Sequence, residues 1–203
     1  MWRKSFLAAA VIAGLIVPAL AQAPPEPPIS VRGSIVKLQD HSITVKTRDG
    51  SLTTVMLAPD YRVNSLERKK LSDIHAGDFV GSTSVPGKDG KLHAVEVHIF
   101  PESLRGAGEG QYPWDSRPQS LMTNATVTGI AKAPQGELLS VHYKNGTAQV
   151  IVGPKTPIVA PVPATAGDLK RGKAVYIFAR KNAAGELTAR SITVEKNGVK
   201  PPM

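Results

Sequence analysis

Apolar and polar residues alternate in short runs along most of this chain. Ile43 and Val45 are separated by Thr44, and Val55 and Leu57 by Met56. A period of two is typical of a strand with one buried face. In the first half we expect five strands, at about 30–38, 42–48, 52–58, 78–85 and 91–100.

Turn signals separate these runs. Asp49-Gly50, Asp89-Gly90 and Asn145-Gly146 are dipeptides typical of hairpins, whose central residues need positive φ. Between the third and fourth strands, Asn64 or Ser65 could cap a two-turn helix over 64–71. The corresponding part of the second half contains Pro157, Pro161 and Pro163, which predict an extended loop.

The same pattern occurs twice. Residues 31–35 match 127–131 at an offset of 96, and residues 73–80 match 168–175 at an offset of 95, so one single-residue gap aligns 31–99 with 127–194. Such self-similarity is the usual sign of a repeated structural unit. We therefore expect an internal duplication.

The last strand of each copy breaks strict alternation. Its apolar residues are spaced by two, three and two, at Leu92, Ala94, Val97 and Ile99 and again at Leu187, Ala189, Ile192 and Val194. A β-bulge would keep all four side chains inward. The alternative is a regular strand with one apolar residue exposed.

Five short strands with a glycine in the first predict an all-β fold of two tandem small OB-like barrels, each of five to six strands. A β-sandwich is the alternative. The pattern V-x-G-x-I, I-T-V-x-T-x-D-G, D-I-x-x-G-D-x-V and D-G-x-L-x-A-x-x-V-x-I resembles an exported bacterial OB-like β-barrel repeat family of unknown function. The joining segment is similar to that of alphaproteobacterial secreted proteins, some labelled as metal ABC transporter components.

The first 21 residues are typical of a signal peptide. Arg3 and Lys4 precede an apolar run from Phe6 to Leu20, and Ala19-Leu20-Ala21 is a small-x-small cleavage site. An uncleaved anchor is the alternative, but the run is short for the ~20 residues of a span. The expected parts are a signal peptide at 1–21, a Pro-rich tether at 22–29, barrels at 30–100 and 125–196, a joining segment at 101–124 and a flexible tail at 197–203.

Composition narrows the location and the partners. The net charge of +9 becomes +7 without Arg3 and Lys4, and the absence of cysteine excludes disulfides, thiolate metal sites and a lipid-modified N-terminal cysteine. We expect a periplasmic or secreted protein that does not span the membrane. Nucleic acid is not an expected partner, because the strands at 42–48 and 52–58 carry no aromatic residue for base stacking.

The joining segment carries the residues best suited to binding. It contains Tyr112 and Trp114 with Arg105, Asp115 and Arg117, and aromatic residues beside arginine are typical of contact hot spots. We expect this surface to meet a protein or the cell envelope. The alternative is that Tyr112 and Trp114 fold back and pack on a barrel.

The sequence contains no catalytic motif, since it has neither a nucleophile elbow nor a phosphate-binding glycine loop. We therefore expect no enzymatic activity and no cofactor. The rival hypothesis is a periplasmic accessory of metal transport. In that case His98, Glu96, His93 and Glu102 would hold a transition-metal ion, because imidazole and carboxylate suit Zn²⁺, Cu²⁺ or Ni²⁺.

Overall fold

The computed structural model describes residues 28–201 and shows an all-β chain, in which this range contains no α-helix. The predicted signal peptide and all but the last two residues of the predicted tether lie outside the described residues. The strands are β1 Ile29–Gln39, β2 Ser42–Thr47, β3 Leu52–Lys69, β4 Phe79–Pro86, β5 Leu92–Ile99, β6 Gly110–Pro113, β7 Leu121–Ala133, β8 Gly136–Tyr143, β9 Gly146–Val152, β10 Ile158–Ala164, β11 Ala174–Lys181 and β12 Leu187–Val194.

Local pattern and turn chemistry account for most of these elements. The five strands expected in the first half are all present, with ends shifted by one or two residues except in β3. Gly50 and Gly90 have φ of 86° and 75°, which a side chain would resist. The hairpins expected at these two glycines are confirmed.

The predicted helix over 64–71 is wrong. These residues continue β3, which is 18 residues long, and only a 3₁₀ turn at Leu71–Asp73 follows. The segment is extended because Val63–Lys69 pairs antiparallel with β10, which gives its backbone groups partners that a helix would otherwise supply. The loop expected around Pro161 and Pro163 is therefore a strand.

Five strands form a closed β-barrel, here called ring A. β1 pairs with β2, β2 with β3, β3 with β12, β12 with β11, and β11 with β1. The β3–β12 pair is parallel, and the other four pairs are antiparallel. Fourteen buried side chains, including Ile35, Ile43, Val45, Ile177 and Ile192, fill the interior.

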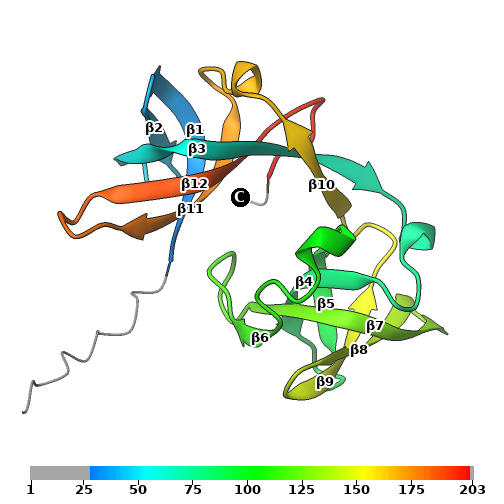
Figure 1. Cartoon of the computed structure of the whole chain (residues 1–203). Helices are drawn as coiled ribbons and strands as arrows, with labels where there is room; N and C mark the ends of the chain where they lie inside the picture. The colour runs from blue at the N-terminus through cyan, green and yellow to red at the C-terminus, as the bar shows by residue number, and fades with distance from the viewer. Residues whose placement is uncertain (1–27, 202–203) are drawn as a thin grey trace, which may run out of the picture.

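Five other strands pair in a second circuit, here called ring B. β7 pairs with β8, β8 with β9, β9 with β5, β5 with β4, and β4 with β7. The parallel contact between β5 and β9 spans only two residue pairs. Each ring thus takes three strands from one half of the chain and two from the other (Figure 1), so the structure does not confirm two tandem barrels.

Two paired segments, here called the arms, connect the rings: the second part of β3 (Val63–Lys69) and β10. Figure 1 shows β3 running from ring A toward ring B, and β10 lies along it. In this ribbon Leu66 faces Pro161, and Val63 faces Ala164. Leu66 and Pro161 are 95 residues apart, the offset found between the two halves of the sequence, so corresponding positions meet here.

The bulges predicted in the last strands are confirmed. Thr83 and Ser84 are neighbours on β4, but their partners on β5 are Glu96 and Ala94, so Val95 is the extra residue. An equivalent shift lies between β11 and β12. All eight apolar side chains of the pattern lie in a core or pack against one.

The end of the described chain packs on the arms. Val199, which lies in the predicted flexible tail, is 9% exposed and forms a small cluster with Leu66 and Val159. The three apolar side chains shield one another from water, which favours this contact. Within residues 28–201 no helix is both long and apolar enough to cross a bilayer.

Candidate functional site

A cavity of about 420 Å³ lies between the two rings. Ring A contributes residues of β1, β11 and β12, ring B contributes residues of β4, β5 and β7, and the arms and the joining segment complete the wall. Five of the eight Phe, Trp and Tyr residues within 28–201 line this one cavity: Phe100, Tyr112, Trp114, Tyr176 and Phe178. This concentration makes the cavity the strongest candidate for a binding site.

Aromatic side chains form a continuous series of contacts across the boundary between ring A and ring B. Trp114 of the joining segment lies nearly parallel to Phe178 of β11, with centroids 6.3 Å apart and 19° between the planes. Tyr112 meets Trp114 edge-on at 6.2 Å, and Tyr176 meets Phe178 edge-on at 5.8 Å. Offset and edge-on contacts are favourable arrangements of aromatic rings.

Arg32 lies in the middle of these contacts. Its Cζ is 4.6 Å from the centroid of Tyr176 and 5.5 Å from that of Trp114, within the range of cation–π attraction. The residue is only 8% exposed, and its Nη1 donates to Oδ2 of Asp115 at 2.7 Å. Its Nε and Nη2 are buried and find no hydrogen-bond partner among residues 28–201.

Two titratable groups beside Arg32, Asp115 and Tyr176, have pKa values that differ from their usual ones. Burial alone would raise the pKa of Asp115, but the hydrogen bond and charge of Arg32 outweigh it, and the pKa lies below its usual value. Burial raises the pKa of Tyr176 to about 12, against a smaller opposing effect of its contact with Ser30. At neutral pH the phenol of Tyr176 is therefore not ionised, and it lies against the guanidinium of Arg32.

Asn124 supplies a second unpaired group. Its Nδ2 donates to the carbonyl of Ala107 at 3.2 Å and to Oη of Tyr112 at 3.3 Å, whereas its buried Oδ1 has no donor among the described residues. Gly81 makes room for this side chain. A Cβ there would lie 2.8 Å from Oδ1 of Asn124 and 2.7 Å from the ring of Phe100.

The structure separates the binding residues expected in the joining segment. Tyr112 and Trp114 line the cavity, whereas Asp115 does not line it but pairs with Arg32, which does. Arg105 instead donates to Glu102 at 2.6 Å and to the carbonyl of Gly77 at 3.0 Å.

Arg117, the fifth predicted binding residue, is exposed, and its backbone N–H donates to Oγ of Ser120. Tyr112 and Trp114 thus fold back onto the rings. This is the packing alternative stated above, and their rings still face an open volume.

The four residues of the metal hypothesis have other partners. Nε2 of His93 lies 3.1 Å from Asp89, His98 contacts Glu96, and Glu102 pairs with Arg105. In the part of the chain that the structure describes, no three metal-ligating side chains gather closely enough to hold one ion. The geometry gives this hypothesis no further support.

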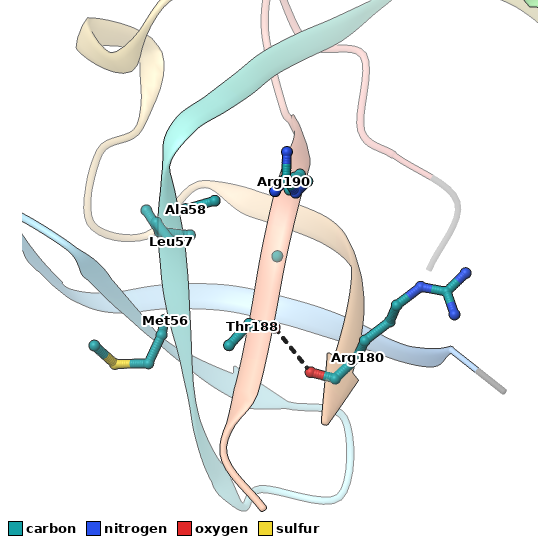
Figure 2. A pocket seen from close by; sticks show the side chains of 7 residues that line it. Met56, Leu57, Ala58, Arg180, Thr188 and Arg190 are labelled. Carbon is teal, nitrogen blue, oxygen red and sulfur yellow. Dashed lines mark hydrogen bonds between the residues drawn. The ribbon is translucent and has the colours of Figure 1, made fainter. Parts of the chain in front are cut away.

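A second cavity, of about 320 Å³, lies where β3 and β12 separate (Figure 2). Met56 and Arg180 extend to opposite sides of it, and Oγ1 of Thr188 donates to the carbonyl of Arg180 at 3.2 Å. Arg190 at its rim pairs with Asp60 at 3.0 Å, and both are exposed. Its wall contains no aromatic residue and no buried unpaired group among those described.

Sequence reasoning missed Arg32, Asn124, Tyr176 and Phe178 as site residues. The run Val175-Tyr176-Ile177-Phe178 carried a usable signal, because a strand that is apolar on both faces is expected to be covered on both. Arg32 carried no such signal, since its neighbours Val31 and Gly33 do not indicate that its side chain is buried.

The chain was compared with protein families, curated proteins and solved structures. No protein-family model, no curated protein and no solved structure matches this chain.

Proposed function

We propose that this chain is an exported, non-enzymatic binding protein, and that the cavity between its rings holds a small ligand with a flat apolar body. The observation that carries the proposal is the gathering of five of eight aromatic residues around one cavity. Its volume of about 420 Å³ is of the size that small-molecule sites have. Export, to the periplasm or beyond the cell, rests on residues 1–21.

We further propose that both rings are OB-like and arose by duplication. Each has five strands, and each closes through a parallel contact between its third strand and a fifth strand from the other half. The strand pairs β4/β5 and β11/β12 begin and end 95 residues apart. These correspondences support the resemblance to the OB-like repeat family.

A cavity ligand fits the geometry better than a contact with a protein or the envelope. A hot-spot tryptophan for a large partner would project outward, whereas Trp114 is half-buried and stacked on Phe178. Phe178 is 42% exposed, and both it and Trp114 line the cavity. A flat molecule could stack there without separating ring A from ring B.

Binding of a neutral aromatic probe tests this function. The chain from residue 22, which contains every described residue, has Trp114 as its single tryptophan. We expect N-phenyl-1-naphthylamine to bind saturably with one site per chain and to quench Trp114 emission, because the probe would lie against its ring. The measurement is a fluorescence titration of both signals.

Two variants locate the probe. Phe178→Ala removes one face of the stack and should weaken binding at least about fivefold, in line with the ~1–3 kcal/mol value of a stacking contact. Leu52→Ala is the matched control, since Leu52 is 66% exposed and does not line the cavity. The proposal fails if the probe does not saturate, or if the two variants weaken it equally.

A further inference from the structure

We infer that the ligand carries an anionic group that binds Arg32, so that its chemical class is an aromatic acid. This inference rests on the proposed function and adds the chemistry of the head group. It is carried by a different observation, namely the state of the Arg32 guanidinium. The five aromatic residues alone would accept a neutral molecule equally well.

Arg32 is a buried cation with unused hydrogen-bonding capacity. A guanidinium has five N–H donors, and this one uses a single nitrogen for Asp115. Buried donors without partners are costly and rare in folded proteins. Both unpaired nitrogens are covered by protein atoms in this structure. A carboxylate or a similar oxyanion that displaces the groups covering them would satisfy two donors at once, through the bidentate geometry that arginine favours.

The partner already present leaves the charge incompletely matched. Asp115 is 54% exposed, so water screens its charge. Arg32, in contrast, is 92% buried and lies against the aromatic side chains of Trp114 and Tyr176. Besides Arg32, His98 is the one titratable nitrogen base on the cavity wall, and it already contacts Glu96. No acidic side chain lines the cavity among the described residues. An incoming anion therefore meets a positive charge and no carboxylate on the wall itself.

The same cavity offers a complementary acceptor. Oδ1 of Asn124 is buried without a donor, and Asn124 lines the cavity together with Arg32. A hydroxyl or amine on the ligand could donate to it. The unpaired atoms of the two side chains therefore describe an aromatic acid that also carries a hydrogen-bond donor.

Two probes that share one aromatic body isolate the anionic group. 8-Anilino-1-naphthalenesulfonate and N-phenyl-1-naphthylamine differ by a sulfonate, so the ratio of their affinities measures its contribution. We expect the sulfonate to bind about tenfold more tightly or better, as for a hydrogen bond to a charged group. Equal affinities would overturn the inference, and binding of the neutral probe would still support the proposed function.

Substitutions assign the preference to Arg32. Arg32→Gln should bring the affinity ratio close to one, and Arg32→Lys should lower it to an intermediate value, because lysine keeps the charge without the planar fork. Asp115→Asn removes the competing carboxylate from an exposed position and should raise the ratio several-fold. Asp60→Asn, which breaks an exposed Arg–Asp pair that does not line the cavity, should leave the ratio unchanged.

The Asp115 variant keeps the test decisive if the Arg32 variants do not fold. A ratio that falls or stays constant in Asp115→Asn contradicts the inference. So does a rise of equal size in Asp60→Asn, which would indicate general attraction to a basic chain.

Displacement by competing acids distinguishes an aromatic acid from a lipid-derived acid. We expect 2-naphthoate to displace the bound sulfonate at lower concentration than decanoate, because a flat ring can stack on Trp114 and Phe178. Stronger displacement by decanoate would contradict the aromatic body and indicate a lipid-derived acid. If neither dye binds at all, the proposed function fails together with this inference.

Discussion

At the scale of single residues, position along a strand decides which side chains reach the cavity. Arg32 follows Val31, which lies in the core of ring A, so alternation turns Arg32 to the outer face. An arginine there would normally reach water. Here β11 of the second half places Tyr176 over it and the joining segment places Trp114 over it, so the residue becomes buried.

Tyr176 gives a pH-dependent prediction at this scale. Burial raises the pKa of its phenol to about 12 from 10.0, so the folded chain holds the neutral form more strongly than the unfolded chain does. This contribution to stability is complete below pH 10 and decreases as the pH rises from 10 toward 12. We expect a late tyrosinate component in an alkaline absorbance titration.

Substitution identifies that component. Tyr176→Phe should reduce its amplitude and make unfolding less sensitive to pH between 10 and 12, as measured by urea denaturation. Tyr61→Phe, which changes a tyrosine outside the cavity, should leave it in place. Burial also raises the pKa of Tyr112, so the contradicting result is a late component that keeps its full amplitude in Tyr176→Phe.

At the scale of elements, the bulges reconcile a broken pattern with a closed ring. Val95 is the extra residue on β5, and it lets Leu92 and Ala94 face the same core as Val97. A bulge also increases local twist, which helps a short sheet to curve. The break was visible in the sequence because both halves carry it.

Alanine substitutions test the bulge. We expect Leu92→Ala to lower the free energy of unfolding by about 1–2 kcal/mol, since a partly buried leucine loses three apolar carbons. Val95→Ala should cost less, because Val95 lies outside the core cluster. Urea denaturation measures both. Strict alternation through Val97 would instead turn Val95 inward and Leu92 outward, and it would reverse the order of the two losses.

At the scale of the whole molecule, the two halves exchange strands. Strand β3 extends for 18 residues, or roughly 60 Å, and this length carries the chain from ring A to ring B. The following β4 and β5 therefore complete a ring with β7, β8 and β9. The exchange creates the cavity, because its wall needs both rings and both arms.

An isolated half should reveal the exchange. Residues 28–109 contain β1 to β5, and the length of β3 keeps β4 and β5 away from β1. We expect this fragment to dimerise, with the first three strands of one copy completed by the last two of another. Light scattering over a dilution series measures the state.

The full chain, in which both ring circuits are formed within one chain, is the control for that series. A fragment that stays monomeric at all concentrations and unfolds cooperatively would contradict the expectation. It would show that one half closes a barrel alone, as the tandem arrangement requires.

The sequence by itself determined most of the strands, the hairpin turns, the last-strand bulges and the prominence of Tyr112 and Trp114. These are local properties, because alternation and positive φ depend on neighbouring residues. The helix prediction at 64–71 failed because its local signal ignored β10, a partner about 95 residues away.

Only the tertiary structure decided which strands complete each ring. The two halves carry similar apolar patterns, so either could accept the last two strands of the other, and local chemistry does not distinguish the choices. That decision places Arg32, Asn124, Tyr176 and Phe178 around one cavity with Trp114. The candidate site is a product of long-range pairing, which is why its outline was visible in the sequence only at Tyr112, Trp114 and Asp115.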